Sequence, residues 1–165
     1  GIKGFLMNTH DVLMYGHQWV HKHLEGLSDE QWLTPNVCGV WSVKDIIAHL
    51  ASFEYLLSDV FESCIHPVET PTLDLFRKMD GDAFNADQVG RRKHLTPQQT
   101  LQEYNNAYEQ VMNHLKKIGE NDLRQTGTIP WYGNEYSLED LVVYQYYGHK
   151  REHCAQIAIF RDTLK

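Results

Sequence analysis

The stretch WSVKDIIAHLASFE, residues 41–54, contains both the start of a long helix and part of its buried face. Ser42 can cap the N-terminus of this helix, and the carboxylate of Asp45 can reach back to the backbone N–H of Ser42. Apolar residues then recur every three or four positions as far as residue 64, which is the period of a helix with one face in a core. The sequence therefore predicts a helix over residues 43–65.

Similar signals mark three other long segments of the chain. Hydroxyl caps precede two later periodic segments, and an apolar seam of bundle type runs along the N-terminal one. These signals predict helices over residues 5–24, 97–118 and 138–162, and we expect the third long helix to stop at a left-handed Gly119. No segment has the alternation of a strand. Four long helices indicate an all-α fold, a four-helix bundle.

The connection between the second and third long helices, residues 66–95, is too long for a plain loop in a compact domain. We therefore expect its segment FNADQVGRRKHL, residues 84–95, to form a short helix. With this long crossover the bundle need not follow a simple up-and-down order. A length of 165 residues suits one domain over residues 1–165.

The composition excludes several classes of partner. A net charge of −7 with 15 scattered lysines and arginines argues against nucleic acid and favours a small-molecule ligand. Three cysteines without a C-x-x-C pair suggest neither a disulfide framework nor a cysteine zinc site. No apolar run approaches the roughly 20 residues of a membrane span, and the N-terminal residues lack the pattern of a signal peptide. We expect a reduced, cytoplasmic protein that does not bind membranes.

The segment GHKREHCAQI, residues 148–157, places two histidines one turn apart on the last helix. His149 and His153 lie about 40° apart around a helix and about 6 Å apart along it, so both rings can reach one ion. The inward stripe of this helix is polar for about three turns, and burying unpartnered polar groups costs roughly 1–3 kcal/mol each. The stripe therefore indicates a bound ion, a shared ligand or a water-filled cavity, although hydrogen-bonded core histidines are the competing interpretation.

His49, two turns into the second helix, could supply a third ligand. Alone it is more typical of a core histidine bonded to a carbonyl. Together with His149 and His153 it would give three neutral imidazoles with open coordination positions, which is the arrangement of a catalytic rather than a structural zinc site.

Other histidines offer competing sites. His17 and His21 repeat the four-residue spacing in the first helix, and His10 lies on the same side. They could form a second metal site, His17 could line the cavity of the first, or they could be ordinary seam histidines. HKREH also matches the H-x-x-E-H of inverted zinc proteases, but those enzymes need a far larger fold and a downstream acidic ligand, so we exclude that interpretation.

Three residues near these histidines were also considered as parts of the site. Asp45 is a capping acid that could also hold the second ring nitrogen of His49. Glu152 is a surface carboxylate that could instead orient a ligand or accept a proton. Cys154 points away from His149 on the helix, so we do not propose it as a nucleophile or ligand.

The order WSVKDIIAH, residues 41–49, followed by H-x-x-x-H in the last helix resembles the DinB/YfiT-like family of metal-dependent enzymes. The resemblance covers nearly the whole chain. It implies a four-helix bundle of up-down-down-up type, a divalent metal ion that is usually nickel or zinc, and a homodimer. It places the metal ligands on His49, His149 and His153. Family members include thiol-dependent transferases and isomerases, so a low-molecular-weight thiol is an expected co-substrate.

Two functions follow from these observations. The favoured one is a metal-dependent enzyme, a hydrolase or thiol transferase acting on a small-molecule substrate. The alternative is a non-catalytic protein that binds or sequesters a small molecule in the same pocket. The sequence identifies no general base, so the catalytic residues are unknown. Aromatic residues are expected near the mouth of the pocket, in the core or at a dimer face: Trp131, Tyr132, Tyr136, Tyr144, Tyr146 and Tyr147.

Overall fold

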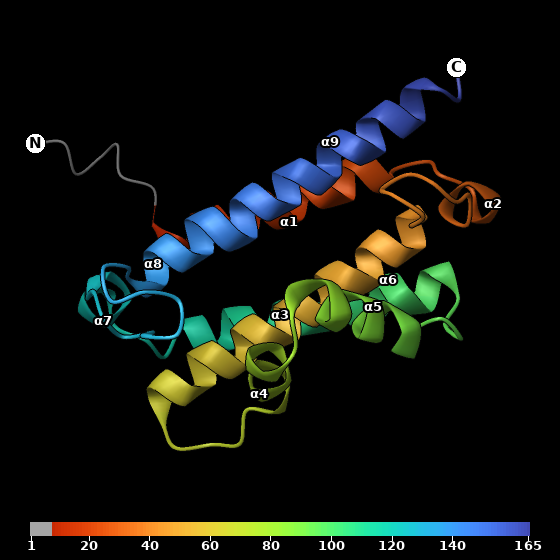
Figure 1. Ribbon diagram of the computed structural model, residues 1–165. Helices are drawn as coiled ribbons and strands as arrows, with labels where there is room; N and C mark the ends of the chain where they lie inside the picture. The colour runs from red at the N-terminus through yellow and green to blue at the C-terminus, as the bar shows by residue number, and fades with distance from the viewer. Residues whose placement is uncertain (1–7) are drawn as a thin grey trace, which may run out of the picture.

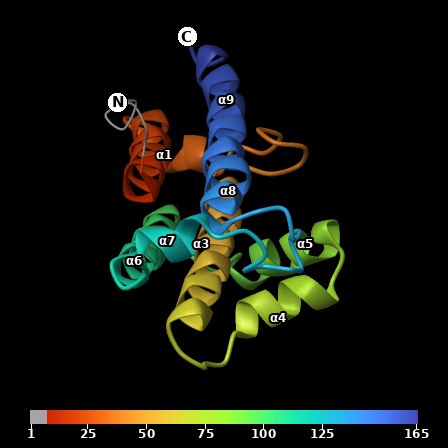
Figure 2. The ribbon, with the colours of Figure 1, turned by 90° about the vertical axis from the view of Figure 1, so that its left-hand side faces the viewer.

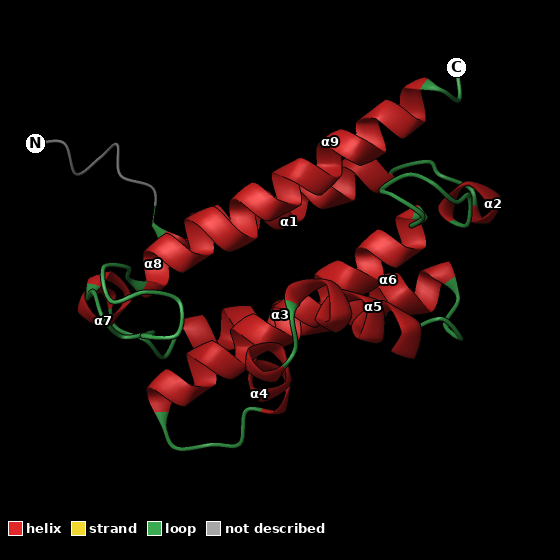
Figure 3. Cartoon of the chain, in the orientation of Figure 1, coloured by secondary structure: helices red, strands yellow, loops and turns green. Residues whose placement is uncertain are grey.

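The computed structural model describes residues 8–165, and the regular elements of this part of the chain are all helices (Figure 3). The prediction of an all-α fold is therefore confirmed. One isolated bridge, between Cys38 and Trp41, is the exception to helix and loop. The helices are α1 Thr9–Leu24, α2 Asp29–Trp32, α3 Val43–Ile65, α4 Pro71–Lys78, α5 Gly81–Arg91, α6 Pro97–Leu115, α7 Glu120–Arg124, α8 Leu138–Leu141, η2 Val142–Tyr147 and α9 Gly148–Asp162.

Helix α3 runs through the centre of the molecule and has the predicted bounds. It begins with the expected capping box, in which the Ser42 hydroxyl accepts from the backbone N–H of Asp45 and the Asp45 carboxylate accepts from the N–H of Ser42. Most of its first five turns is buried, because other helices contact it on several sides. Polar residues in these turns, such as His49 and Glu54, are therefore buried.

The long helices form two layers (Figure 1). Helix α1 lies along α9 and η2, while α6 lies along α3. The two layers meet where α3 contacts α9 and where α1 contacts α6. Two apolar clusters fill the space between them, one around Leu57 and Phe61 and the other around Ile46, Leu50 and Ile157.

The connection between α3 and α6 contains two helices. Figure 2 shows α4 and α5 on the side of α3 away from α6, and both contact α3. Helix α5 confirms the short helix predicted in this connection, although it begins at Gly81. Helix α4 was not predicted; Pro71 at its first turn is a helix-start signal that sequence reasoning did not use.

The last long helix is not uniform. Its first turn, α8, follows a capping box of Ser137 and Asp140 and leads into the π-helix η2. The backbone N–H of Gly148 donates to the carbonyl oxygen of Val143, five residues earlier, and α9 follows without a break. A π-turn holds an extra residue, and such turns are frequent at functional sites.

Two predicted helix ends differ from the structure. Residues 5–7 of the first predicted helix lie outside the described residues, and α1 begins at Thr9 with Asn8 as its cap. The prediction that the third long helix ends at a left-handed Gly119 was wrong. Helix α6 ends at Leu115, and Gly119 has a φ of −70° as the N-cap of the short helix α7.

Within residues 8–165, no helix combines the length and the apolar composition that a membrane crossing needs.

Candidate metal centre

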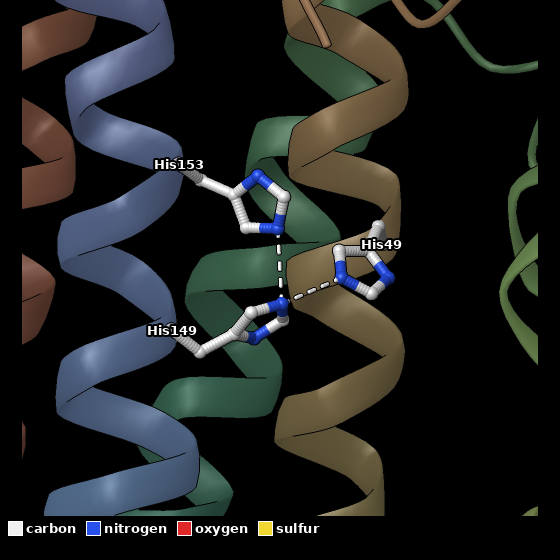
Figure 4. A group of neighbouring side chains, drawn as sticks. All are labelled: His49, His149 and His153. Carbon is white, nitrogen blue, oxygen red and sulfur yellow. Dashed lines mark hydrogen bonds between the residues drawn. The ribbon is translucent and has the colours of Figure 1, made fainter. Parts of the chain in front are cut away.

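Three histidines from two helices meet between the layers (Figure 4). The Nε2 atom of His149 lies 3.0 Å from Nε2 of His49 and 2.9 Å from Nε2 of His153. The potential ligand atoms of all three lie within 4.8 Å of one another. Separations of this size allow one ion to contact several rings at the usual nitrogen–metal distance of about 2.0–2.1 Å.

The helices position these rings in different ways. His49 lies in the buried part of α3, two turns after the capping box, and is 2% exposed. His149 and His153 lie in the first two turns of α9, directly after η2, and project from the same side of that helix toward α3 (Figure 4). The predicted one-turn spacing therefore brings two rings together, and α3 brings the third.

Burial keeps the three rings neutral. It lowers the pKa of His49 to about 2, with the neighbouring His149 and His153 as further causes. Burial also lowers the pKa of His149 to about 4 and lowers that of His153. Neutral imidazole is the form that ligates a metal, since a protonated ring nitrogen has no lone pair to offer.

The second ring nitrogens decide which nitrogen faces the centre. Nδ1 of His153 lies 2.8 Å from Oε1 of Gln156, an oxygen that can only accept, so Nδ1 carries the proton and Nε2 presents its lone pair. Nδ1 of His49 is buried and has no hydrogen-bond partner among the described residues. The possible contact from Asp45 to His49 does not occur, because the Asp45 carboxylate binds the N–H of Ser42 and Nζ of Lys93.

Aromatic rings border the three histidines. The centroid of the Trp41 ring lies 5.0 Å from that of His49. The Phe53 ring centroid lies 4.8 Å from His49 and 5.0 Å from His149. These rings limit contact with water, which strengthens electrostatic interactions at the centre.

Comparison with protein families decides the membership of this chain. A family profile described as the DinB superfamily matches residues 16–157, which include all three histidines. The chain belongs to the DinB superfamily. The comparison with curated proteins found no match, and neither did the comparison with solved structures.

The first-helix histidines of this DinB protein do not join the centre. His17 stacks on Tyr108 at 3.7 Å between centroids, and its other ring contacts are His21 and Tyr104. Nε2 of His21 lies 2.7 Å from Oδ1 of Asn105. Among the described residues, the one group of His, Cys, Asp and Glu arranged to hold a metal is His49, His149 and His153. The contact of His21 fits a hydrogen-bonded seam histidine, whereas Nδ1 of His17 is buried and has no hydrogen-bond partner among the described residues.

The remaining candidates also have defined positions in this DinB protein. His10 is exposed and lies beside Asp11. Glu152 is exposed on α9. Cys154 is buried, and burial raises the pKa of its thiol to about 12, so it is not poised as a nucleophile. These positions agree with the sequence-based exclusion of Cys154.

Sequence reasoning missed a buried ion pair beside the centre. Nζ of Lys150 lies 2.5 Å from Oε1 of Glu54, and their side chains are 3% and 0% exposed. The pair joins α9 to α3, and the Lys150 nitrogen lies 5.6 Å from the centroid of the Tyr104 ring. The sequence signal that could have identified this pair is a charged residue on the inner face of each helix: Glu54 on α3, and Lys150, which follows His149, on α9.

Proposed function

We propose that this protein is a divalent-metal-dependent enzyme that acts on a small molecule. The observation that supports the proposal is the convergence of three neutral, mostly buried imidazoles from α3 and α9. Within residues 8–165, no fourth His, Cys, Asp or Glu belongs to this group. Three protein ligands with open positions are typical of catalytic metal sites, whereas structural zinc sites use four.

The residues around the centre have separable roles in this proposal. His49, His149 and His153 would hold the ion through ring nitrogens. When bound, a divalent ion supplies Lewis acidity, which polarises a carbonyl or lowers the pKa of a bound water or thiol. The side-chain oxygen of Gln156 accepts a hydrogen bond from Nδ1–H of His153 and so fixes the orientation of that ring. Trp41 and Phe53 exclude water from one side of the rings.

The finer assignments are proposals of the same kind. We propose nickel or zinc as the ion and a low-molecular-weight thiol as a co-substrate of a thiol transferase, with hydrolysis as the other reaction type. We also propose that α1, α3, α6 and α8–α9 form a DinB/YfiT-like four-helix bundle with the crossover between its second and third helices. A single domain over residues 1–165, a homodimer, a cytoplasmic location and the absence of nucleic-acid and membrane partners remain predictions.

A non-catalytic binding or sequestering protein is the alternative function. This alternative is supported by the composition of the described histidine group, which contains no carboxylate. Asp45 binds Lys93, and Glu152 is exposed on the surface of α9. A general base normally lies within hydrogen-bond reach of the proton that it accepts. In this alternative the same pocket holds a small molecule and the ion anchors it.

Metal analysis and turnover assays test the proposal. Protein purified without a histidine tag should contain about one equivalent of nickel or zinc, measured by mass spectrometry of the metal. The loaded protein should then form a thioether from N-acetylcysteine and 1-chloro-2,4-dinitrobenzene, or hydrolyse 4-nitrophenyl acetate, faster than its His149→Ala variant. One equivalent of metal without turnover in either assay would favour the binding function, and absence of metal from protein offered both ions would contradict both functions.

A further inference from the structure

An aromatic cavity lies next to the histidine centre. It has a volume of about 270 Å³ and is formed by residues of α3, α4, α8, η2 and the loop before α8. Cavities of roughly 150 Å³ are large enough for a benzene ring. The lining residues are mostly aromatic and none of them is charged: Phe53, Leu56, Phe76, Trp131, Tyr132, Leu141, Gln145 and Tyr146.

Two residues connect this cavity to the centre. Phe53 is a shared wall, since its ring lines the cavity and contacts the rings of His49 and His149. Gln145 lines the cavity and lies on η2 one turn before His149. A molecule in this cavity is therefore separated from the histidines by about one ring or one helical turn.

The rings of the cavity are arranged to contact another planar group. Phe76 meets Trp131 and Phe53 edge to face, at centroid distances of 6.2 Å and 6.1 Å. Edge-to-face and offset contacts are the favoured geometries for a further aromatic ring. One polar pair is present, because Nε2 of Gln145 lies 3.4 Å from the hydroxyl of Tyr132. A bond of this length is weak and could be exchanged for one to a ligand.

The chemistry of the lining selects among ligand classes. Without a charged residue, the cavity would leave an ionic group unpaired, and burying an unpaired charge is costly. By contrast, the cavity between α4, α5 and α6 includes Arg91, Arg92 and Glu103, and neither Trp41 nor Phe53, the rings beside His49, lines it. The aromatic cavity suits a neutral, planar, apolar group with at most one polar substituent.

We propose that the aromatic cavity binds an aryl group of the substrate while the reactive end of the same molecule lies at the histidine centre. This inference rests on the proposed metal-dependent function and adds the substrate class, a small aryl compound. The molecule would pass the edge of the Phe53 ring, with its aryl group on the cavity side and its reactive end on the histidine side. The amide of Gln145 or the hydroxyl of Tyr132 would bind a polar substituent on the aryl ring.

A series of hydroxamates tests the inference, since each compound carries the same metal-binding head. Acetohydroxamate is compared with benzohydroxamate, phenylacetohydroxamate and 3-phenylpropanohydroxamate on the metal-loaded protein by titration calorimetry. At least one aryl compound should bind about tenfold or more tightly than acetohydroxamate, because burying a phenyl-sized group contributes about that much. Aryl compounds that all bind as weakly as acetohydroxamate would overturn the inference.

Matched variants test whether the higher affinity of the aryl hydroxamates comes from the aromatic cavity. Trp131→Ala should reduce the aryl-to-methyl affinity ratio about tenfold, while Trp19→Ala, which removes an exposed tryptophan of α1, should leave the ratio unchanged. Phe76→Leu is a milder second variant that removes one ring and should also lower the ratio. A gain that persists in both cavity variants would show that the aryl group binds elsewhere.

A metal-independent ligand separates this inference from the proposed function. If no hydroxamate binds in a metal-dependent way, the proposed function fails and the inference about its substrate fails with it. Benzyl alcohol, which needs no metal, then tests whether the cavity still binds an aryl group. Saturable NMR shifts of the Trp131 indole signal would identify such an aryl site. Metal-dependent hydroxamate binding without any aryl gain would instead leave the proposed function intact and overturn the inference alone.

Discussion

Replacing Lys150 with methionine should lower the free energy of unfolding by about 3–5 kcal/mol. Lys150 and Glu54 form an ion pair whose side chains are 3% and 0% exposed. Removal of the lysine leaves the Glu54 carboxylate buried without its partner, and the cost of an uncompensated buried charge exceeds that of most single substitutions. Methionine keeps much of the volume of lysine, so a cavity contributes little to the expected loss.

The assay is urea denaturation of the metal-free protein, followed by circular dichroism at 222 nm. Metal-free protein is needed because bound metal would add its own stabilisation to the measurement. Lys93→Met is the matched control. Lys93 binds Asp45 at 2.9 Å, but its side chain is 61% exposed, so its loss should be about 1 kcal/mol or less.

The double variant Glu54→Leu, Lys150→Met provides the second half of the test. Replacing both charges with apolar side chains removes the desolvation cost, so the double variant should recover most of the stability lost in Lys150→Met. Equal losses for the Lys150 and Lys93 variants, or a double variant less stable than Lys150→Met, would refute the reasoning from burial.

Three further predictions follow from the site. His149→Ala should abolish stoichiometric metal binding in a folded protein, while the His17→Ala, His21→Ala double variant should keep it; mass spectrometry of the metal would reveal the opposite result. Burial lowers the pKa of His17 to about 3, so an unfolded chain binds a proton there between about pH 6.5 and 3 that the folded protein does not. Stability should fall as pH drops through this window, and His17→Phe should reduce that fall in urea midpoints at pH 7 and 5; an unchanged slope would contradict it. Asp45→Ala should cost about 0.5–2 kcal/mol through the capping box without weakening metal affinity in a competition titration, whereas a tenfold loss of affinity would show that Asp45 acts on His49.

Local signals account for the parts of the fold that the sequence predicted well. The hydroxyls of Ser42, Thr96 and Ser137 each form the capping box expected of them, because a cap depends on residues only three positions apart. The π-helix η2 was not predicted. The capping box before it is that of an ordinary α-helix, and the packing of η2 against α1 could not be derived from residues close to it in the sequence.

In the candidate site too, local spacing predicted some features, and others depend on how the helices pack. The pairing of His149 with His153 follows from helical spacing, and that pair could be identified from the sequence. His49 was a candidate third ligand from the sequence, and the family resemblance also assigned it; its position opposite the pair is seen in the structure. Of the residues that line the aromatic cavity, Trp131, Tyr132 and Tyr146 were among the aromatic residues expected near the pocket. The contribution of Phe76 could not be derived, because it reaches Phe53 only through the placement of α4 against α3.

The π-turn affects how the number of residues between Leu138 and the two histidines relates to their positions. Deletion of one residue within η2, such as the 59% exposed Tyr144, would restore a uniform α-helix and leave Leu138 and the two histidines on the sides of the helix that they now occupy, because the π-turn absorbs one residue without turning the helix that follows. A deletion elsewhere between α8 and His149, with the π-turn kept, would instead rotate both histidines by about 100° relative to Leu138. A relative that has one residue fewer here and a uniform helix would therefore keep the centre, so the spacing between Leu138 and the histidines is not diagnostic by itself when relatives are compared.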